Sequence, residues 1–431
     1  MNIVIDLSFL ERWSYLPIPL IAWQIFLNGG WIIFLFVFFW MVWQKWLEHI
    51  QAKFEAEQKY VLLAIDVPRD NEQGPEAVER LFAHLAGIKY TGSWFDRNFR
   101  GYIQPEMSFE LISLEGQIQF LVRTPVQYRD LVEAAIYTTY PNAMINEVED
   151  YSEKVAVSFP NEEYDLWGAD LVLYNDDVYP IRTYPFFEHP LTQELKDPLG
   201  NLLEILSKFG PGEQAWLQLI ISPLGLDWGA EGERLVQNLM KQRVEVKVSG
   251  LDRLTDLPVE IIRRIGEGVV PSLPVTKTEK ARESVVLSPG ERRVIEAIQG
   301  KLSKIAFEVK FRIIYLAKKE IFSSARGVAG ILGAINQFNT LDMNGFKPSS
   351  WAKTSGGLIF AKKRLAKKQN DILEAYRARS SGWGGKTCTL NIEELASIYH
   401  FPVSTVKAPL IKKTGSKRGE PPFGLPIKEN F

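Results

Sequence analysis

The sequence predicts an α+β protein in which an N-terminal transmembrane helix is followed by tandem ferredoxin-like (βαββαβ) units and a basic helical C-terminal region. Three observations lead to this prediction. An uncharged apolar run lies near the N-terminus, short apolar strands alternate with amphipathic helices between residues 59 and 345, and basic residues gather after residue 346. With 431 residues, 46% of them hydrophobic, the chain is long enough for two or three domains with real cores.

The apolar run contains no charged residue between Arg12 and Lys45, and it is unbroken from Trp31 to Trp43. Taken over residues 20–46, it exceeds the roughly 20 residues that a helix needs to cross a bilayer. A buried core helix is the alternative, but it would not need so many aromatic residues. A cleaved signal peptide does not fit, because the run is too long and no small-residue cleavage site follows it.

Tryptophans and basic residues predict how this span is oriented. Four tryptophans occupy positions typical of an interfacial aromatic belt: Trp23, Trp40, Trp43 and Trp46. Lysines follow the span while little positive charge precedes it, which predicts a single-pass protein of the cytoplasmic (inner) membrane with its C-terminal domains in the cytoplasm. Residues 1–19 are then a short extracytoplasmic segment and 47–58 a juxtamembrane helix. Whether Asn28-Gly29-Gly30 kinks the span stays open.

The first predicted domain, residues 59–152, has the βαββαβ order of a ferredoxin-like unit. Its elements are a strand at 60–67, a helix from Pro75, strands at 109–114 and 117–122, a helix at 128–136 and a strand at 143–148. Pro75 occupies a favoured first helical position, and Glu115-Gly116 between two apolar runs is typical of a hairpin. Because many unrelated functions use this fold, it predicts no activity.

The second predicted domain, residues 153–345, follows an acidic and aromatic link at 147–177 and resembles the first, with an insertion at about 244–302. Its elements are strands at 171–174 and 181–184, a helix at 197–210, a strand at 215–222, a helix at 231–240, a strand at 306–316 and a helix at 322–338. Ser288 and Glu291 form a capping-box sequence that begins a helix in the insertion. Three glycines at a helical spacing predict a face that another element approaches closely: Gly327, Gly330 and Gly333.

Residues 346–431 form a basic helical region with an extended tail, and contain 16 Lys and Arg against 6 Asp and Glu, a net charge of +10. Since the whole chain has a net charge of −2, residues 1–345 have −12. A basic helix is expected at 358–379 and a short strand at 387–390. Asn391 is the expected N-cap of a last helix, with Glu393 and Glu394 in its first turn.

The sequence Gly384-Gly385-Lys386-Thr387 suggests the end of a P-loop, but its surroundings exclude one. Ser380 stands where the first glycine of G-x-x-x-x-G-K-[ST] should be, a charged helix precedes the turn, and a strand follows it. A P-loop needs the reverse order, a buried strand and then a helix. We therefore interpret Lys386 as one more charge of a basic surface.

No other motif favours catalysis, so the chain is predicted not to be an enzyme and to need no cofactor or metal. The four histidines are scattered, no H-E-x-x-H or cysteine pair is present, and Cys388 is the single cysteine. An enzyme with a site that sequence motifs do not reveal stays as a third alternative.

The basic C-terminal region holds the candidate binding residues. They form a surface suited to DNA phosphates without sequence preference, to anionic lipid headgroups or to an acidic partner protein. The candidate residues are Lys362, Lys363, Arg364, Lys367, Lys368, Arg377, Arg379 and Lys386. A solvated helix with charged faces is the structural alternative.

Several phrases of the chain resemble one membrane-proximal module. They are Leu390–Ala396, Tyr399-His400-Phe401-Pro402 and the Glu420-Pro421-Pro422 segment, with FELISLEGQIQFLVRTP earlier in the chain. The module precedes the ATPase domain in membrane ATPases related to type IV secretion and conjugation coupling proteins of candidate-phyla bacteria. The resemblance covers about residues 56–427.

In those relatives a Walker-type domain would follow, whereas this sequence ends at Phe431, so the resemblance carries no catalytic residues. It implies a non-catalytic, membrane-anchored scaffold or adaptor of a type IV secretion-like or pilus-like machine that transfers DNA or protein. Its partners would be membrane lipid, a separate ATPase subunit, DNA and further copies of itself as a homo-oligomer. The alternative is a membrane-tethered module that binds nucleic acid or anionic lipid without a motor partner. The sequence does not identify the transported substrate.

Overall fold

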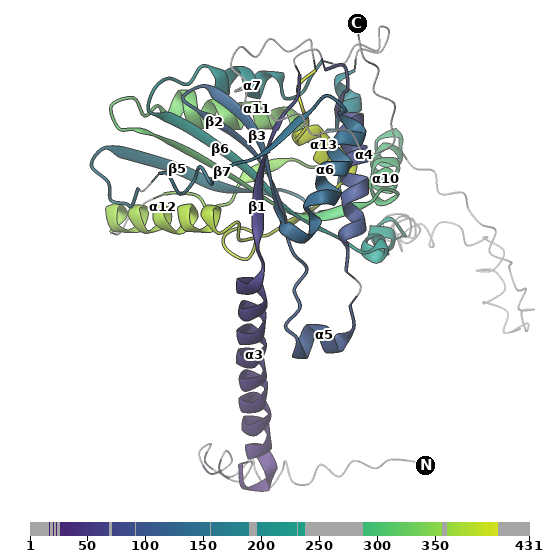
Figure 1. Ribbon diagram of the computed structural model, residues 1–431. Helices are drawn as coiled ribbons and strands as arrows, with labels where there is room; N and C mark the ends of the chain where they lie inside the picture. The colour runs from purple at the N-terminus through teal and green to yellow at the C-terminus, as the bar shows by residue number, and fades with distance from the viewer. Residues whose placement is uncertain are drawn as a thin grey trace, which may run out of the picture. The chain divides into compact units, whose positions relative to one another are not determined.

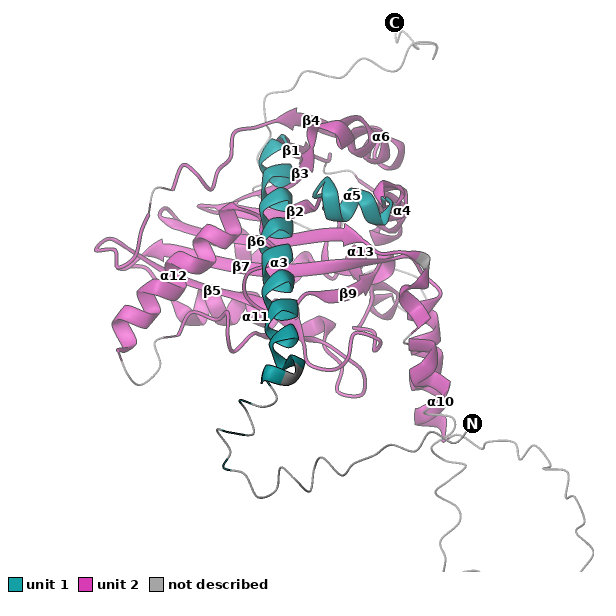
Figure 2. Cartoon of the chain, turned by 90° about the horizontal axis from the view of Figure 1, so that it is seen from below, with its two compact units in different colours: residues 1–59, 90–104 teal, residues 60–89, 105–431 magenta. Residues whose placement is uncertain are grey.

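The computed structural model describes residues 17, 20, 23, 26–68, 71–90, 92–155, 157–188, 196–230, 232–237, 288–355 and 360–403. These residues belong to two compact units, one of residues 1–59 with 90–104 and one of residues 60–89 with 105–431 (Figure 2). Three predictions fall outside the described residues: nearly all of the extracytoplasmic segment 1–19, the part of the insertion at 244–287 and the extended tail after residue 403.

The first unit is built on a long apolar helix. A π-helical turn, Phe26–Gly30, leads into α3, Trp31–Glu57, which is 27 residues long and buries none of its residues. By length and composition α3 could cross a membrane, and it unites residues 31–46 of the predicted span with the predicted juxtamembrane helix in one element. At Gly29 the backbone has φ +106°, a value that favours glycine, so the helix is interrupted where the sequence raised the question of a kink.

A short aromatic segment accompanies α3 in this unit. Residues 90–104 contain α5, Trp94–Phe99, whose N-cap is Ser93. The Ser93 side chain accepts from the backbone N–H of Asp96, and the Asp96 carboxylate accepts from the backbone N–H of Ser93, which is a complete capping box. No helix or strand was predicted for these residues.

The second unit is organised around an antiparallel nine-stranded sheet (Figure 1). The strands lie in the order β4-β1-β3-β2-β6-β7-β5-β8. The ninth strand, β9, pairs with Ala306–Val309 of β7, before the part of β7 that pairs with β5. Their bounds are β1 Tyr60–Asp66, β2 Met107–Leu114, β3 Gln117–Pro125, β4 Met144–Glu147, β5 Tyr164–Leu173, β6 Glu213–Pro223, β7 Ala306–Lys318, β8 Phe346–Pro348 and β9 Cys388–Asn391.

Seven helices with described bounds belong to the same unit. They are α4 Pro75–Leu85, α6 Arg129–Thr139, α7 Gly200–Ser207, α10 Pro289–Leu302, α11 Gly330–Ile335, α12 Ala361–Arg377 and α13 Ile392–Ile398. Single 3₁₀ turns lie at Ala86–Ile88, Val126–Tyr128, Tyr184–Phe187, Leu226–Gly229 and Asn336–Phe338, and a π-helical turn, Ser324–Ala329, leads into α11.

The sheet consists of two halves with the same order of elements. The first is β1-α4-β2-β3-α6-β4 and the second β5-α7-β6-β7-α11-β8. In each half the first and third strands are neighbours, and the second and fourth strands lie outside them. The halves meet through an antiparallel pairing of β2 with β6 that runs from Met107 opposite Ile221 to Leu114 opposite Gln214. The two predicted α+β domains therefore share one sheet.

Alternating strand residues build a core on each face of this sheet. On one face, Leu111, Leu217 and Ile313 belong to a core that includes residues of α4, α6, α7, α11 and α13. On the other face, Ile112, Trp216 and Ile314 pack with α12 and with residues 148–159. Figure 1 shows α12 and the α7–α11 pair on opposite faces of the strands.

Most of the predicted elements of this unit are confirmed. Glu115 and Gly116 have φ +54° and +87°, which fits the tight β2–β3 hairpin that the sequence indicated. Ser288 with Glu291 and Asn391 with Glu394 both form complete capping boxes. The predicted close approach at the repeated glycines is confirmed at Gly327, where an added Cβ would lie 2.4 Å from the Tyr315 ring.

Two predictions between residues 147 and 184 are wrong. The predicted strand at 171–174 is only the end of β5, which begins at Tyr164 inside the predicted acidic link, and no strand lies at 181–184, where the chain instead enters a 3₁₀ turn at Tyr184. The error has a physical cause. Asp170 looks like a surface residue in the sequence, but in β5 it is fully buried and paired with Arg312.

Candidate functional site

A row of four buried polar residues crosses the middle of the sheet, beneath the end of α12. Glu110 on β2 pairs with Gln218 on β6, Gln218 with Arg312 on β7, and Arg312 with Asp170 on β5. Each of the four side chains has no exposed surface. Residues opposite one another in a sheet point to the same face, so the four form one continuous polar row among apolar neighbours. A buried row of this kind is expected to find its partners within the fold, and of these four residues only the side-chain oxygen of Gln218 has none.

Arg312 binds the chain that follows α12. Its Nε donates to Asp170 over 2.8 Å, which forms a fully buried ion pair. The remaining guanidinium N–H groups donate to the backbone oxygens of Ala375 at 2.8 Å, Ser380 at 3.3 Å and Trp383 at 3.1 Å. One arginine therefore neutralises a buried carboxylate and holds the C-terminal end of α12 on the sheet.

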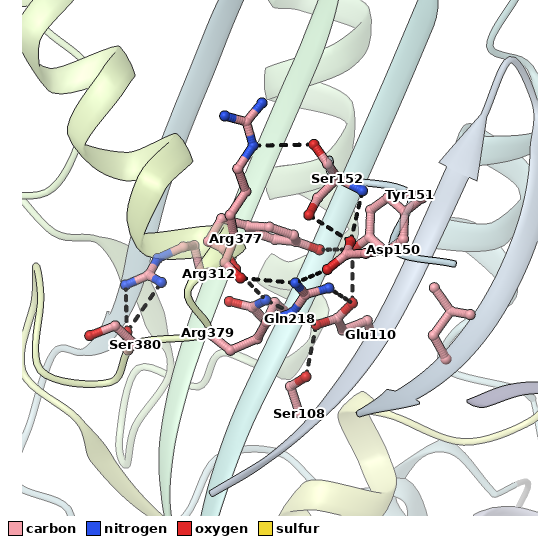
Figure 3. A network of polar contacts seen from close by, with 12 residues as sticks. Ser108, Glu110, Asp150, Tyr151, Ser152, Gln218, Arg312, Arg377, Arg379 and Ser380 are labelled. Atoms are coloured by element: carbon pink, nitrogen blue, oxygen red, sulfur yellow. Dashed lines mark hydrogen bonds and ion pairs between the residues drawn. The ribbon is translucent and has the colours of Figure 1, made fainter. Parts of the chain in front are cut away.

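Glu110 is the second centre of this network, which Figure 3 shows at close range. Its carboxylate accepts from the Ser108 hydroxyl at 2.7 Å and from Gln218 Nε2 at 3.0 Å. Arg379 donates to it from Nε at 3.0 Å and also binds Asp150. The carboxylate also accepts from the Tyr151 hydroxyl at 2.9 Å.

Two buried tyrosines, Tyr151 and Tyr376, complete the network around Glu110. Since the Tyr151 proton is used on Glu110, Tyr376 of α12 donates to the Tyr151 oxygen over 2.5 Å. Burial raises the pKa of both phenols well above the usual value, so they remain neutral donors. Burial opposes the charge of Arg379, but Glu110 and Asp150 outweigh it and raise the pKa of this guanidinium, which therefore stays charged.

The glycine-rich turn after α12 is part of the same arrangement. Gly384 has φ +96°, and the backbone N–H of Gly385 donates to Asp170 over 2.8 Å. Lys310, which is buried, donates to the Gly385 carbonyl oxygen. In a P-loop such amides would bind phosphate, whereas here the Gly385 N–H binds a carboxylate of the chain itself. The turn thus holds the C-terminal segment in place.

The structure divides the predicted basic residues into two groups. The exposed group lies on the first two turns of α12: Lys362, Lys363, Arg364 and Lys367. Lys368 is half-buried and donates to the Lys353 backbone oxygen at 3.2 Å. Arg377 donates to the backbone oxygens of Ser152 and Val155, and Arg379 is the buried partner of Glu110. Both arginines therefore belong to the fold and are removed from the predicted surface.

Lys386 is exposed but has acidic surroundings. It lines an open cavity of 1120 Å³ together with Asp176 and Asp177. The Asp177 carboxylate accepts from the backbone N–H of Thr389, and the Thr387 hydroxyl donates to Glu308 at 2.6 Å. With Asp342, which also lines it, the cavity has three carboxylates beside one lysine and no positive excess, so Lys386 does not extend the basic surface of α12.

The C-terminal residues 390–402, whose sequence resembles the membrane-proximal module, pack into the core. Tyr399 and Phe401 pack on Phe120, and His400 Nε2 lies 2.9 Å from an oxygen of Asp197. Its Nδ1 lies 2.8 Å from the Ala396 carbonyl oxygen. The family-like phrase thus has a packing role in this chain.

The predicted interfacial tryptophans lie on the apolar helix or before it. Trp23, Trp40 and Trp46 are exposed, and Trp43 is half-buried by its contact with Phe99, whose ring lies 5.7 Å away. Among the described residues, no group of three or more His, Cys, Asp and Glu side chains is placed to hold a metal ion.

Sequence reasoning missed two sets of residues that the structure brings together. The buried row is hidden in the sequence because even neighbouring members lie far apart, with 142 positions between Asp170 and Arg312. The aromatic segment had a local signal, since Ser93 and Asp96 form a capping-box pattern around Trp94-Phe95.

A family model described as a domain of unknown function, DUF8128, matches residues 44–414. The match begins within α3 and extends past the last described residue, so it includes the whole nine-stranded sheet and the C-terminal helices. No curated protein matches the chain.

Proposed function

This chain belongs to the DUF8128 family, and from that premise we propose that it is a non-catalytic, membrane-anchored scaffold or adaptor. It would serve a type IV secretion-like or pilus-like transfer machine and act beside a separate ATPase. One observation carries the membrane-anchored part of the proposal: an apolar helix without any buried residue, α3, ends at Glu57, and the first strand of a large sheet begins at Tyr60. Such a helix needs an apolar surrounding that its own chain does not supply.

The membrane role is supported by the charge pattern around α3. The helix has no charged residue before Lys45, and its exposed apolar side chains include Phe36 and Trp40. With Lys45, Lys53 and Lys59 after the apolar part, the positive-inside rule favours a cytoplasmic location for the sheet. The protein would then be a single-pass protein of the inner membrane.

A scaffold role is supported by the way the body is built. We interpret its two halves as tandem ferredoxin-like units joined edge to edge, because each has the βαββαβ order and the strand order of that fold. The polar residues that this sheet gathers at its centre bind one another and the backbone after α12. They are therefore used to hold the fold together rather than exposed to a substrate.

The secretion role rests on the resemblance of the C-terminal phrases to the module that precedes the ATPase in conjugation-type proteins. In this chain the phrase from Leu390 to Phe401 lies in β9, α13 and the residues after them, which are largely buried.

Purification of the full chain from membranes in mild detergent tests the proposal, with identification of the proteins that accompany it. An ATPase recovered with the chain supports the scaffold role. Recovery of nucleic acid without any ATPase overturns it in favour of the alternative below. A C-terminal reporter that is active only outside the cytoplasm tests the orientation, and activity of that reporter would contradict the assigned side.

A second candidate function is favoured by the exposed basic half of α12. Lys362, Lys363, Arg364 and Lys367 are free of the buried network that fixes the other end of the helix. A rigidly held helix with four exposed cations could bind a DNA backbone or anionic headgroups without a motor partner.

Replacement of these four residues by glutamine tests the second candidate. We expect weaker retention of duplex DNA. The slope of the logarithm of the binding constant against the logarithm of the salt concentration should be less steep by about 0.9 for each phosphate that the variant no longer neutralises. The matched control neutralises four exposed basic residues elsewhere in the body: Arg80, Arg292, Arg293 and Lys319. Equal retention by the two variants would remove the basis of this candidate.

A further inference from the structure

The segment 90–104 exposes large aromatic side chains on a short helix. Trp94 is 67% exposed, Phe95 54% and Phe99 45%. Their rings gather into one patch, because Phe99 lies 5.8 Å from Trp94 and 4.9 Å from Phe95. A contiguous aromatic patch of this kind, on residues that leave the second unit only to return to it at Pro105, marks a surface that contacts something apolar.

The segment 90–104 packs against α3 through three successive contacts. The Tyr102 ring lies 5.1 Å from Phe54, and the Phe99 ring lies 5.7 Å from Trp43. Between them Gly101, with φ +68°, allows a close backbone approach, since a Cβ there would lie 2.4 Å from the Ile50 oxygen. The segment therefore runs along α3 from Phe54 to Trp43, which is about 16 Å at 1.5 Å per residue.

The contact between Phe99 and Trp43 shows how far along α3, toward its apolar end, the aromatic patch reaches. Trp43 is the last residue of the unbroken apolar run from Trp31, and the first charge follows at Lys45. On a spanning helix this transition marks the boundary between the hydrocarbon and the headgroups, where tryptophan is favoured. Because Phe99 contacts Trp43, the aromatic patch lies beside α3 at that same boundary.

The remaining side chains of α5 fit this depth. Arg97 and Arg100 are exposed, and Arg100 pairs with Asp96 at 3.0 Å. The capping box of Ser93 and Asp96 satisfies the first backbone N–H groups of the helix. A helix with a capped N-terminus, aromatic rings and basic residues suits the interface between acyl chains and anionic headgroups.

We infer that residues 90–104 are a second membrane contact, in which Trp94, Phe95 and Phe99 enter the interfacial layer of the bilayer beside α3. The inference rests on the proposed membrane span, and it adds an interfacial anchor from a distant part of the sequence. The lipid surface, rather than a protein partner, is the occupant, because at Trp43 the patch meets the uncharged part of α3, whose apolar side chains from Trp31 to Val42 are all exposed.

Site-directed fluorescence quenching tests the inference with the full chain in lipid nanodiscs. A Phe95→Cys variant carries an environment-sensitive label, and a lipid with a nitroxide near the headgroup serves as the quencher. Gln44→Cys on α3 gives the interfacial reference, and Leu341→Cys in an exposed turn of the sheet unit gives the aqueous reference. The one native cysteine, Cys388, is buried, so the unmodified chain serves as the labelling blank.

We expect quenching at residue 95 to equal that at residue 44 and to exceed that at residue 341 several-fold. Quenching at 44 with none at 95 overturns the interfacial anchor and leaves the span intact. A label at 95 that is shielded from water but not quenched shows that a protein covers the patch, which also overturns the inference. Absence of quenching at both 44 and 95 rejects the membrane span itself.

Discussion

Arg379 donates from Nε to the Glu110 carboxylate over 3.0 Å, although 269 positions separate the two residues in the chain. Arg379 lies just past the end of α12 in a left-handed backbone conformation, with φ +48°, and Glu110 lies in the middle of β2. Both side chains are buried, so the pair ties the C-terminal part of the chain to the centre of the first half of the sheet.

Removing one partner of this pair should be costly. We expect Arg379→Met to lower the free energy of unfolding by about 3–5 kcal/mol, because Glu110 would be left as a buried charge without its cation. The double variant with Glu110→Gln should recover part of the loss. Urea unfolding of the sheet unit in the detergent-solubilised full chain measures both values, and Lys363→Met, at an exposed position, serves as the control. Strictly additive losses would show that the two residues do not interact.

The repeated glycines of the α11 region should respond in opposite ways to alanine. At Gly327 the new Cβ would meet the Tyr315 ring, and we expect a loss of about 1–3 kcal/mol from overpacking. At Gly333 no atom lies within 4 Å of the added Cβ, so alanine should be neutral or stabilise by up to about 1 kcal/mol. Thermal unfolding of the two variants beside the parent chain measures the contrast. Equal losses would show that the close contact with Tyr315 is not what selects glycine.

The Asp197–His400 contact should make stability fall in acid. Burial alone would raise the pKa of Asp197, but His400 and the backbone N–H groups of Val403 and Leu199 outweigh it and lower this pKa. A lowered folded-state pKa gives stability that is present above the unfolded value of about 3.9 and is lost as pH falls through the folded value.

Asp197→Asn should therefore be less stable than the parent at pH 7, by about 1–3 kcal/mol, with a difference that shrinks as the pH approaches 3. Denaturant unfolding at several pH values between 7 and 3 gives the two curves. Asp342 is exposed and lies outside this contact, so Asp342→Asn should run parallel to the parent. A constant difference between Asp197→Asn and the parent would exclude the ionised carboxylate as the cause.

The membrane span predicts a position-dependent cost of charge. We expect Val37→Lys to reduce membrane insertion, since a lysine at the centre of a span costs about 2.5–3.5 kcal/mol. Gln44→Lys, next to Trp43 at the expected boundary, should insert almost as well as the parent because its ammonium can reach the headgroups. Alkaline extraction of membranes separates inserted from peripheral chain. Equal retention of both variants would argue that α3 is covered by protein instead of lipid.

Much of the fold could be predicted because its signals are local. The β2–β3 hairpin follows from Glu115-Gly116 between two apolar runs, and α10 and α13 begin at capping boxes that are visible as Ser288 with Glu291 and Asn391 with Glu394. Such patterns need only a few neighbouring residues. Only the end of the strand β5, at 171–173, could be found in this way, since Asp170 becomes a core residue only through Arg312.

The candidate site was predicted in part for the same reason. A run of basic residues at 362–379 shows that a helix is basic, but only the packing of α12 on the sheet decides which members face solvent. Lys363 and Arg379 look alike in sequence, yet one is exposed and the other is buried against Glu110. The position of Trp94 beside α3 depends on a fold-back of the chain that no local pattern encodes.

The pairing of β2 with β6 has a consequence for any attempt to study the body in pieces. Each of these strands would be the outermost one of its own half, and their mutual hydrogen bonds cover both borders from Met107 to Leu114. A fragment cut between the halves would expose a long row of unpaired amide and carbonyl groups, which is a template for self-association. The smallest piece that leaves the sheet whole therefore contains both halves, from Tyr60 through Val403, and fragments that divide them should precipitate.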